Sequence, residues 1–184
     1  MADNVNRQWL IAARPQGMIK ESDFKYNEAD IPEPGEGEVL VRTLMISVDP
    51  AMRGQMENRA DYVAPLEIGD VMRSGGVGQV VKSNHPDFKE GDLVQGSTGM
   101  QDYFVTDNKA NPLRKLSKGV GVEDALSIFG GTGFTAYYGM MELGQPKDGS
   151  NVLVSGAAGA VGTIAGQLAK IKGARVVGIA GSDE

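Results

Sequence analysis

The sequence predicts an α/β protein in which a β domain, residues 1–125, precedes the first part of a doubly wound parallel sheet, residues 126–184. In the first part, short apolar segments alternate with glycine- and proline-rich turns, which is typical of a compact barrel-like β domain. Helical patterns begin only near residue 122. Residues 151–180 then read as strand, glycine turn, helix and strand, the order of a βαβ unit. A complete doubly wound sheet has about six strands, so the sequence is expected to be a fragment of a longer protein.

The β domain is predicted from apolar and alternating segments that are separated by turn residues. The expected strands are residues 8–13, 23–30, 38–48, 71–81, 93–94 and 101–106. Residues 51–56, after Asp49 and Pro50, are expected to form a turn or a short helix. Glycines at positions 75, 76 and 78 predict that the strand over 71–81 bends or bulges.

The second part is predicted from helical spacing and from helix-ending residues. Residues 122–129 are expected to form a helix, and Thr132 is expected to cap the next one. The stripe of that second helix ends at Gly144 and consists of Phe134, Tyr137, Tyr138 and Met141. The βαβ unit has predicted buried strands at 152–154 and 176–179. Its helix ends before Gly173 and carries an apolar stripe of Val161, Ile164, Ala165, Leu168 and Ile171.

The turn between the strand and the helix predicts a dinucleotide site. It has the spacing A-x-G-x-x-G, with an alanine where the common fingerprint has its first glycine. The third position, Gly162, is expected to let the helix pack close to the sheet, and Gly159 to let the backbone approach a pyrophosphate. The helix N-terminus adds N–H donors and a partial positive charge. The other interpretation is a tight connection without a ligand. The expected cofactor-binding residues of the turn are Gly156, Ala157, Ala158, Gly159, Ala160, Val161 and Gly162.

The end of the second strand favours NADP(H) over NAD(H). An NAD site usually has a carboxylate there for the ribose 2′-hydroxyl, whereas this strand ends in Gly181 and Ser182. This small neutral corner leaves room for a 2′-phosphate. Asp183 and Glu184 follow directly and are expected to be solvated residues of a first helical turn.

Composition narrows the class of protein further. The formal net charge is -6, which argues against nucleic acid or an anionic membrane as a partner. There is no cysteine, which excludes a disulfide framework and a reactive thiol. No apolar run is long enough to cross a bilayer, and the first residues lack the apolar core of a signal peptide. The expected location is the cytoplasm.

The motifs together resemble those of the medium-chain dehydrogenase/reductase superfamily, in which a GroES-like catalytic domain precedes a Rossmann domain. The resemblance covers essentially the whole chain and is closest to the zinc-independent branch of leukotriene/prostaglandin reductases, plant double-bond reductases and bacterial curcumin reductases. The matching segments are residues 34–42 (PGEGEVLVR), 47–50 (SVDP), 52–54 (MRG), 131–137 (GTGFTAY), 155–162 (SGAAGAVG) and 180–184 (AGSDE).

This resemblance implies NADPH-dependent reduction of a carbon–carbon double bond conjugated to a carbonyl, as in an enone or enal. Hydride would go to the β carbon and a proton to the α carbon. It places Thr135 beside the nicotinamide half of the cofactor, or else on a helix surface without a role. It also assigns Gly181 and Ser182 to the 2′-phosphate, and it implies a homodimer for the full-length protein.

Catalytic residues are not assigned by the motifs. Ala51 stands where relatives often have a tyrosine, and Met100 replaces a common tryptophan, so the substrate pocket is expected to differ. Tyr62 and Arg53 are the weak candidates; their alternative roles are an exposed loop tyrosine and a structural ion-pair partner. No metal is expected, because a catalytic zinc site needs cysteine and histidine ligands. The one histidine, His85, lies in a predicted turn and is expected at the surface.

Two other functions stay open at this level. The same superfamily includes quinone reductases, and the departures at Ala51 and Met100 leave a quinone substrate open. The chain could also be a cofactor-binding or interaction protein without catalysis, which suits a fragment that carries half a site.

Overall fold

The computed structural model describes residues 5–57 and 64–181. The chain divides into two compact units, Met1–Val122 and Glu123–Glu184. The predicted domain boundary, between residues 125 and 126, lies a few residues further along the chain. Each unit is described below by itself. Among the described residues, no helix has both the length and the apolar character needed to span a membrane.

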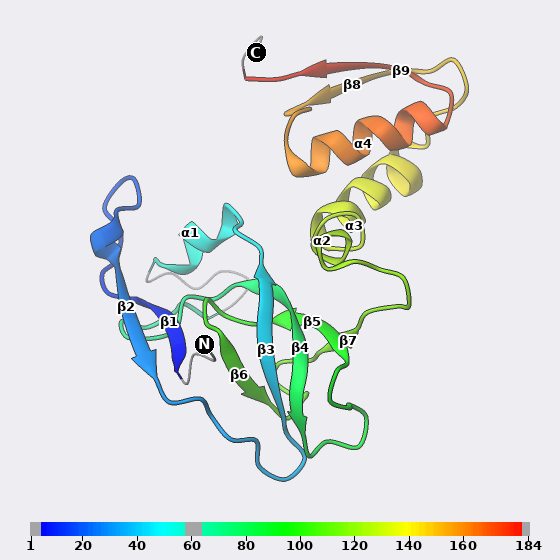
Figure 1. The fold of residues 1–184 in the computed structure, drawn as a ribbon. Helices are drawn as coiled ribbons and strands as arrows, with labels where there is room; N and C mark the ends of the chain where they lie inside the picture. The colour runs from blue at the N-terminus through cyan, green and yellow to red at the C-terminus, as the bar shows by residue number, and fades with distance from the viewer. Residues whose placement is uncertain (1–4, 58–63, 182–184) are drawn as a thin grey trace. The chain divides into compact units, whose positions relative to one another are not determined.

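The first unit is built from short strands, as predicted, and they pair in antiparallel fashion (Figure 1). A five-stranded sheet has the order β6-β3-β4-β5-β7, and a separate hairpin consists of β1 and β2. The strands are β1 (Asn6–Ile11), β2 (Phe24–Ala29), β3 (Val39–Ile46), β4 (Gly75–Ser83), β5 (Leu93–Ser97), β6 (Tyr103–Thr106) and β7 (Arg114–Lys115). Two short helical segments, η1 (Glu21–Asp23) and α1 (Ala51–Gln55), complete the unit.

Backbone hydrogen bonds attach strand β1 of the hairpin to two loops, which contain Met72 and Met100. Trp9 N–H donates to the carbonyl of Met100 (2.9 Å), and Met72 N–H donates to the carbonyl of Trp9 (2.8 Å). Met100 N–H donates in turn to the carbonyl of Met72 (2.8 Å). One edge of β1 is therefore bonded to two loops that come from distant parts of the sequence.

The core of the first unit includes the start of β3, where Val39, Leu40 and Val41 are all buried. Val39 and Val41 belong to a cluster that also contains Val80, Phe88, Val94, Phe104 and Leu113. A second cluster under the hairpin consists of Ile11, Met56, Leu66 and Met72. The GroES-like β domain predicted for this region is confirmed.

The predicted irregularity of the glycine-rich strand is present, and the neighbouring strand has one as well. Leu40 pairs with Lys82 and Val41 with Val80, which leaves Val81 of β4 as an extra residue. Thr43 pairs with Gly78 and Met45 with Val77, which leaves Leu44 of β3 as an extra residue. The glycines of β4 serve a close approach: a Cβ at Gly78 would lie 2.6 Å from the carbonyl oxygen of Arg42. Residues 71–74, predicted as part of the strand, lie outside it, and Val71 makes only an isolated bridge to Leu10.

The second unit begins with helices whose limits differ from the prediction. Helix α2 (Val122–Leu126) is shorter than predicted, and α3 (Gly131–Tyr137) has Gly130 as its N-cap. Thr132 lies inside α3 and its Oγ1 donates to the carbonyl of Ser127 (3.3 Å), so the prediction that it caps the helix was wrong. The physical reason is a tight entry into the helix: a Cβ at Gly133 would lie 1.9 Å from the carbonyl oxygen of Ile128.

A π-helical segment, η2 (Tyr138–Gly144), continues α3 and ends at Gly144, as expected. Gln145, the next residue, adopts a positive φ of 43°. Two residues of the predicted apolar stripe, Phe134 and Tyr138, stack on one another with ring centroids 6.1 Å apart. Both are at least half exposed.

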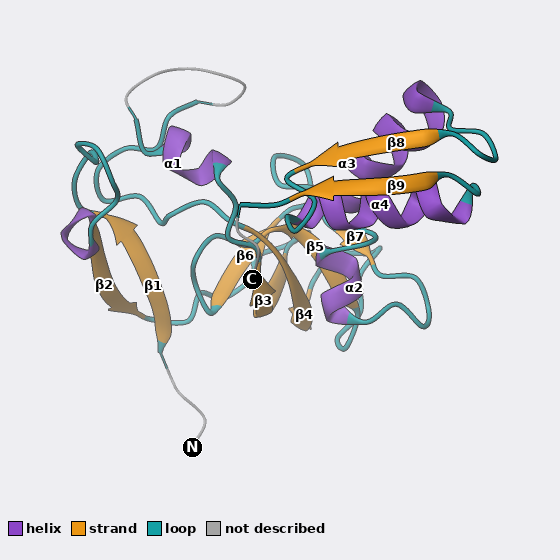
Figure 2. Cartoon of the chain, turned by 90° about the horizontal axis from the view of Figure 1, so that it is seen from above, coloured by secondary structure: helices purple, strands orange, loops and turns teal. Residues whose placement is uncertain are grey.

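The βαβ unit has the predicted order, with β8 (Asn151–Ser155), α4 (Ala160–Ile171) and β9 (Arg175–Ile179). The two strands pair in parallel, and α4 and α3 lie on one side of them (Figure 2). The helix buries Gly162 and Ala169, while Val161 and Ile171 of the predicted stripe are exposed. Of the strand residues predicted to be buried, Val154 is buried and Leu153 is 67% exposed. Leu153 is exposed because the helices lie on only one side of the two strands (Figure 2).

Candidate functional site

The glycine turn joins the end of β8 to the start of α4 and is built from local hydrogen bonds. Gly156 has a φ of +59°, a left-handed backbone conformation that residues other than glycine rarely adopt. Gly159 N–H donates to the carbonyl of Gly156 (2.9 Å), which closes the turn. Ala157 N–H donates to the carbonyl of Ile179 (2.9 Å), which holds the turn against the end of β9.

Gly162 lets the first turn of α4 approach the preceding backbone. A Cβ at this position would lie 2.2 Å from the carbonyl oxygen of Gly156 and 2.9 Å from the Cα of Ala157. The close approach therefore involves the glycine turn itself, not the strands of the sheet as predicted. This contact requires the absence of a side chain at Gly162.

Two residues that sequence reasoning missed support the same turn. Thr163 Oγ1 donates to the carbonyl of Ala157 (3.1 Å), and its N–H donates to the carbonyl of Gly159 (2.9 Å). Gly178 makes room for the side chain of Ala157, since a Cβ at 178 would lie 2.7 Å from the Cβ of Ala157. A glycine inside an apolar strand was the available signal. The missing side chain at Gly178 explains how Ala157 fits where the common fingerprint has a glycine.

The exposed edge of the turn offers hydrogen-bond donors. The first N–H groups of a helix have no partner within the helix, and the helix dipole concentrates positive charge there. In α4 these groups belong to Ala160, Val161 and Gly162, and the first of them follows Gly159, which is the N-cap. Ala158, Gly159 and Ala160 are exposed. This arrangement can bind an anionic group such as a phosphate.

Comparisons with known proteins place this geometry in a family. Residues 7–113 match the family model described as the N-terminal domain of oxidoreductase. The chain is 45% identical over 180 residues to the NADPH-dependent curcumin reductase of Escherichia coli, covering 97% of this chain and 52% of that protein. It is 48% identical, with the same coverage, to a putative NADP-dependent oxidoreductase of Bacillus subtilis.

The solved structure of CurA from Vibrio vulnificus in complex with NADPH superposes with a TM-score of 0.87 at 42% identity. The match covers 96% of this chain and 52% of that one. The chain belongs to the medium-chain dehydrogenase/reductase superfamily, in the zinc-independent curcumin-reductase branch. It spans about half the length of the curated relatives it matches.

The other predicted cofactor residues have less distinctive surroundings. Thr135 is exposed on α3, and its Oγ1 donates to the carbonyl of Gly131 (2.8 Å). Gly181 is exposed, and no atom lies within 4 Å of the position that its Cβ would take. Ser182 lies outside the described residues. The roles of these three residues toward the cofactor stay predictions.

The structure describes only one of the two catalytic candidates. Tyr62 lies outside the described residues. Arg53, in α1, forms an ion pair with Glu57 (2.8 Å) and donates to the carbonyl oxygens of Pro15 (3.4 Å) and Gly17 (3.2 Å). These contacts attach α1 to the loop that follows β1, which is a structural role, and a catalytic role of Arg53 stays a prediction.

His85 lies in a turn, as predicted, and is partly exposed. Its side chain is 13% exposed and packs edge-on against Phe88, with ring centroids 5.1 Å apart. The Nδ1 atom accepts a hydrogen bond from the backbone N–H of Asp87 (3.1 Å). The side chain is only partly exposed because it packs against Phe88, a member of the first hydrophobic cluster.

Proposed function

We propose that the full-length protein uses NADPH to reduce a carbon–carbon double bond conjugated to a carbonyl group. The observation that carries the proposal is the combination of the glycine-turn geometry with 45% identity, over nearly the whole chain, to an NADPH-dependent curcumin reductase. A tobacco relative, 38% identical, is named as an NADP-dependent 2-alkenal reductase. Conjugated enones and enals are therefore the proposed substrate class.

The residues present fit this cofactor. The turn from Gly156 to Gly162 has no side chain larger than that of valine, and the first N–H groups of α4, which have no partner within the helix, would bind a pyrophosphate. The described end of β9 is followed by Ala180 and Gly181, without a carboxylate, which supports NADPH over NADH. Gly181 and Ser182 would hold the 2′-phosphate, and Thr135 would lie beside the nicotinamide half. The proposal includes no metal.

When bound, NADPH supplies a hydride, which we propose is transferred to the β carbon of the substrate, while the α carbon receives a proton. The balanced reaction is enone plus NADPH plus one proton, giving the saturated ketone and NADP⁺. The chain contributes by binding the cofactor at the glycine turn and by fixing its orientation, which lowers the entropic cost of bringing the two reactants together. The donor of the proton is unassigned.

The test is an assay of the full-length protein with 4-phenyl-3-buten-2-one and either NADPH or NADH. We expect NADPH to be oxidised and 4-phenyl-2-butanone to form, with much slower turnover with NADH. NADPH that carries deuterium at the transferred position should place the label on the β carbon. An allylic alcohol as product, or no turnover with a broad panel of enones, would contradict the proposal.

The same assay distinguishes an enone reductase from a quinone reductase. A quinone reductase would oxidise NADPH faster with 1,4-benzoquinone than with any enone of the panel. A protein that binds NADPH and turns over neither class would be a cofactor-binding protein without catalysis. We also propose a homodimer for the full-length protein, which light scattering during size-exclusion chromatography would test.

A further inference from the structure

Three contacts of Ala157 hold the glycine turn against both the helix and the sheet. Its N–H donates to the carbonyl of Ile179 at the end of β9 (2.9 Å). Its carbonyl oxygen accepts from Thr163 Oγ1 in the first turn of α4 (3.1 Å). Its methyl group lies where Gly178 has no side chain, since a Cβ at 178 would be 2.7 Å from the Cβ of Ala157. This one residue is therefore fixed by β9 and by α4 together.

The hydroxyl of Thr163 makes an unusual bond for a helix. A threonine inside a helix commonly donates to the carbonyl four residues before it, as Thr135 does to Gly131 (2.8 Å). Thr163 instead reaches back six residues, out of the helix and into the turn. Its hydroxyl therefore connects α4 to the turn rather than supporting α4 itself.

This bond determines the orientation of the peptide between Ala157 and Ala158. The carbonyl of Ala157 and the N–H of Ala158 belong to one planar trans peptide and point in opposite directions. Because Thr163 binds the carbonyl, the N–H points away from the threonine. Ala158 is exposed, and among the described residues its N–H makes no hydrogen bond. The turn can therefore offer this donor to an anion beside the first N–H groups of α4.

No second donor holds the carbonyl of Ala157 in the part of the chain that the structure describes. The N–H of Thr163 donates to the carbonyl of Gly159 (2.9 Å), and the N–H of Gly159 donates to the carbonyl of Gly156 (2.9 Å). Loss of the hydroxyl would leave this carbonyl without a partner and free to turn. A carbonyl oxygen turned toward a phosphate would repel it, because both carry negative charge.

Gly178 limits the position of Ala157 from the side of the sheet. Val177 and Ile179, its neighbours in β9, are about half exposed. Successive residues of a strand point to opposite faces, so residue 178 belongs to the face that α4 covers (Figure 2). Val176 points to the same face, since its Cγ1 lies 3.7 Å from the position of a Cβ at Gly166 in α4. A side chain at 178 would push Ala157 out of its place.

We propose that Thr163 and Gly178 are positioning residues for the cofactor. Acting through Ala157, they hold the glycine turn in the form that binds the pyrophosphate of NADPH. Neither residue belongs to the glycine fingerprint. This inference rests on the proposed function, because it takes NADPH as the ligand of the turn.

The test of Thr163 compares two ligands of the full-length protein by isothermal titration calorimetry. One is NADPH, and the other is adenosine 2′-monophosphate, which carries the 2′-phosphate but no pyrophosphate. Thr163→Val keeps the shape of the side chain and removes the hydroxyl. It should weaken NADPH binding by roughly 2- to 10-fold, the range of one hydrogen bond, and leave adenosine 2′-monophosphate binding unchanged. Thr163→Ser retains the hydroxyl and should bind NADPH with wild-type affinity.

The matched control is Thr132→Val. Thr132 Oγ1 also donates to a backbone carbonyl, that of Ser127 (3.3 Å), but it lies in α3. This variant should change the affinity for neither ligand.

The test of Gly178 is a pair of compensating substitutions. Gly178→Ala should weaken NADPH binding, because the new methyl group collides with that of Ala157. Ala157→Gly removes the second methyl group, so the double variant with both substitutions should regain most of the affinity. Non-additive effects of this kind identify residues that act through direct contact. Thermal melts by circular dichroism verify that each variant is folded.

The outcomes separate this inference from the proposed function. Equal NADPH affinity in the wild type and Thr163→Val would overturn the role of Thr163. Equal losses for NADPH and adenosine 2′-monophosphate would overturn it too, because they indicate a general disturbance of the fold. A double variant that binds no better than Gly178→Ala would overturn the role of Gly178. Absence of NADPH binding by the wild type would overturn the proposed function, and this inference with it.

Discussion

At the scale of single residues, the glycines of the turn after β8 have separate physical tasks. Gly156 adopts a left-handed conformation, and Gly159 begins the helix as its N-cap. Gly162 alone is sterically closed by backbone, with the carbonyl oxygen of Gly156 2.2 Å from the position of its Cβ. Gly166, one turn further in the same helix, has its nearest neighbour at 3.7 Å, an ordinary contact with Val176.

This difference predicts opposite effects for two alanine substitutions in α4. Gly162→Ala should lower the free energy of unfolding by about 1–3 kcal/mol and weaken NADPH binding at least ~10-fold, because the backbone of the turn must move. Gly166→Ala should be neutral or up to about 1 kcal/mol more stable, since alanine is the better helix former. Urea unfolding and NADPH titration measure both. Equal affinity for NADPH in the two variants would show that the turn does not position the phosphates.

At the scale of elements, β3 and β4 define the shape of the first unit. The two strands approach closely where glycine leaves space: a Cβ at Gly78 would lie 2.6 Å from the carbonyl oxygen of Arg42 and 2.5 Å from Cγ1 of Val41. At Gly75, the first residue of the same strand, nothing lies within 4 Å. The inner glycine is required by the packing of the pair, and the outer one is not.

The corresponding prediction compares Gly78→Ala with Gly75→Ala. The inner substitution should lower the free energy of unfolding by about 1–3 kcal/mol, because the added methyl group displaces β3. The outer substitution should change it by less than about 0.5 kcal/mol. Thermal or urea unfolding followed by circular dichroism measures both. A stable Gly78→Ala protein would mean that β3 can shift without cost.

At the scale of the whole molecule, the chain consists of two compact units that meet near Val122. The segment just before this point is exposed at Ser117, Lys118 and Gly119. Exposed turns between compact units are preferred sites of proteolysis, because the backbone must open locally to be cut.

We therefore expect limited trypsin treatment to cut early after Lys118 and to leave a stable fragment that contains the first unit. Mass spectrometry of the time course identifies the cut. In the control variant Lys118→Gln this fragment should form much more slowly. Early cutting after Lys25 or Lys82, which lie in β2 and β4, would contradict the description of the first unit as compact.

The sequence by itself determined the features that depend on local periodicity and on glycine spacing. The βαβ order, the parallel pair of β8 and β9 and the turn between β8 and α4 agree with the prediction because each is formed by residues close together in the chain. The motifs also identified the superfamily branch. Thr163 and Gly178 were missed because their role depends on contacts across the turn, with Ala157.

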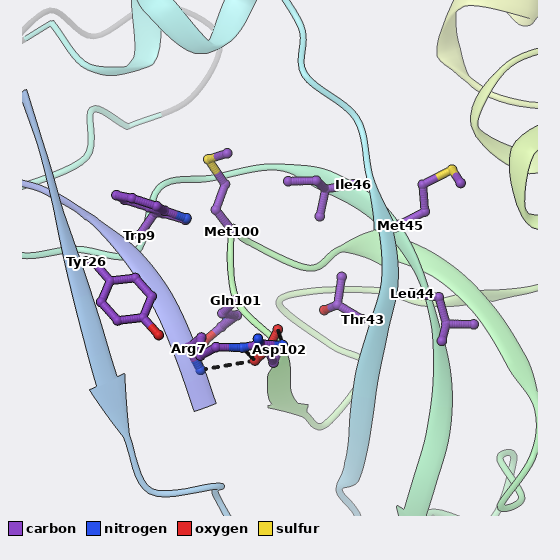
Figure 3. A pocket seen from close by; sticks show the side chains of 10 residues that line it. All are labelled: Arg7, Trp9, Tyr26, Thr43, Leu44, Met45, Ile46, Met100, Gln101 and Asp102. Atoms are coloured by element: carbon purple, nitrogen blue, oxygen red, sulfur yellow. Dashed lines mark hydrogen bonds and ion pairs between the residues drawn. The ribbon is translucent and has the colours of Figure 1, made fainter. Parts of the chain in front are cut away.

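Only the tertiary structure decided what depends on distant contacts. The partial burial of His85 follows from its packing against Phe88, and the N-cap at Gly130 follows from the tight entry into α3. A cavity between the β1–β2 hairpin and β3 (Figure 3) arises where the segment before β6 leaves β3 and bonds to β1, which brings together residues that are far apart in the sequence. No local pattern encodes such a gap, because its walls exist only when the strands have paired.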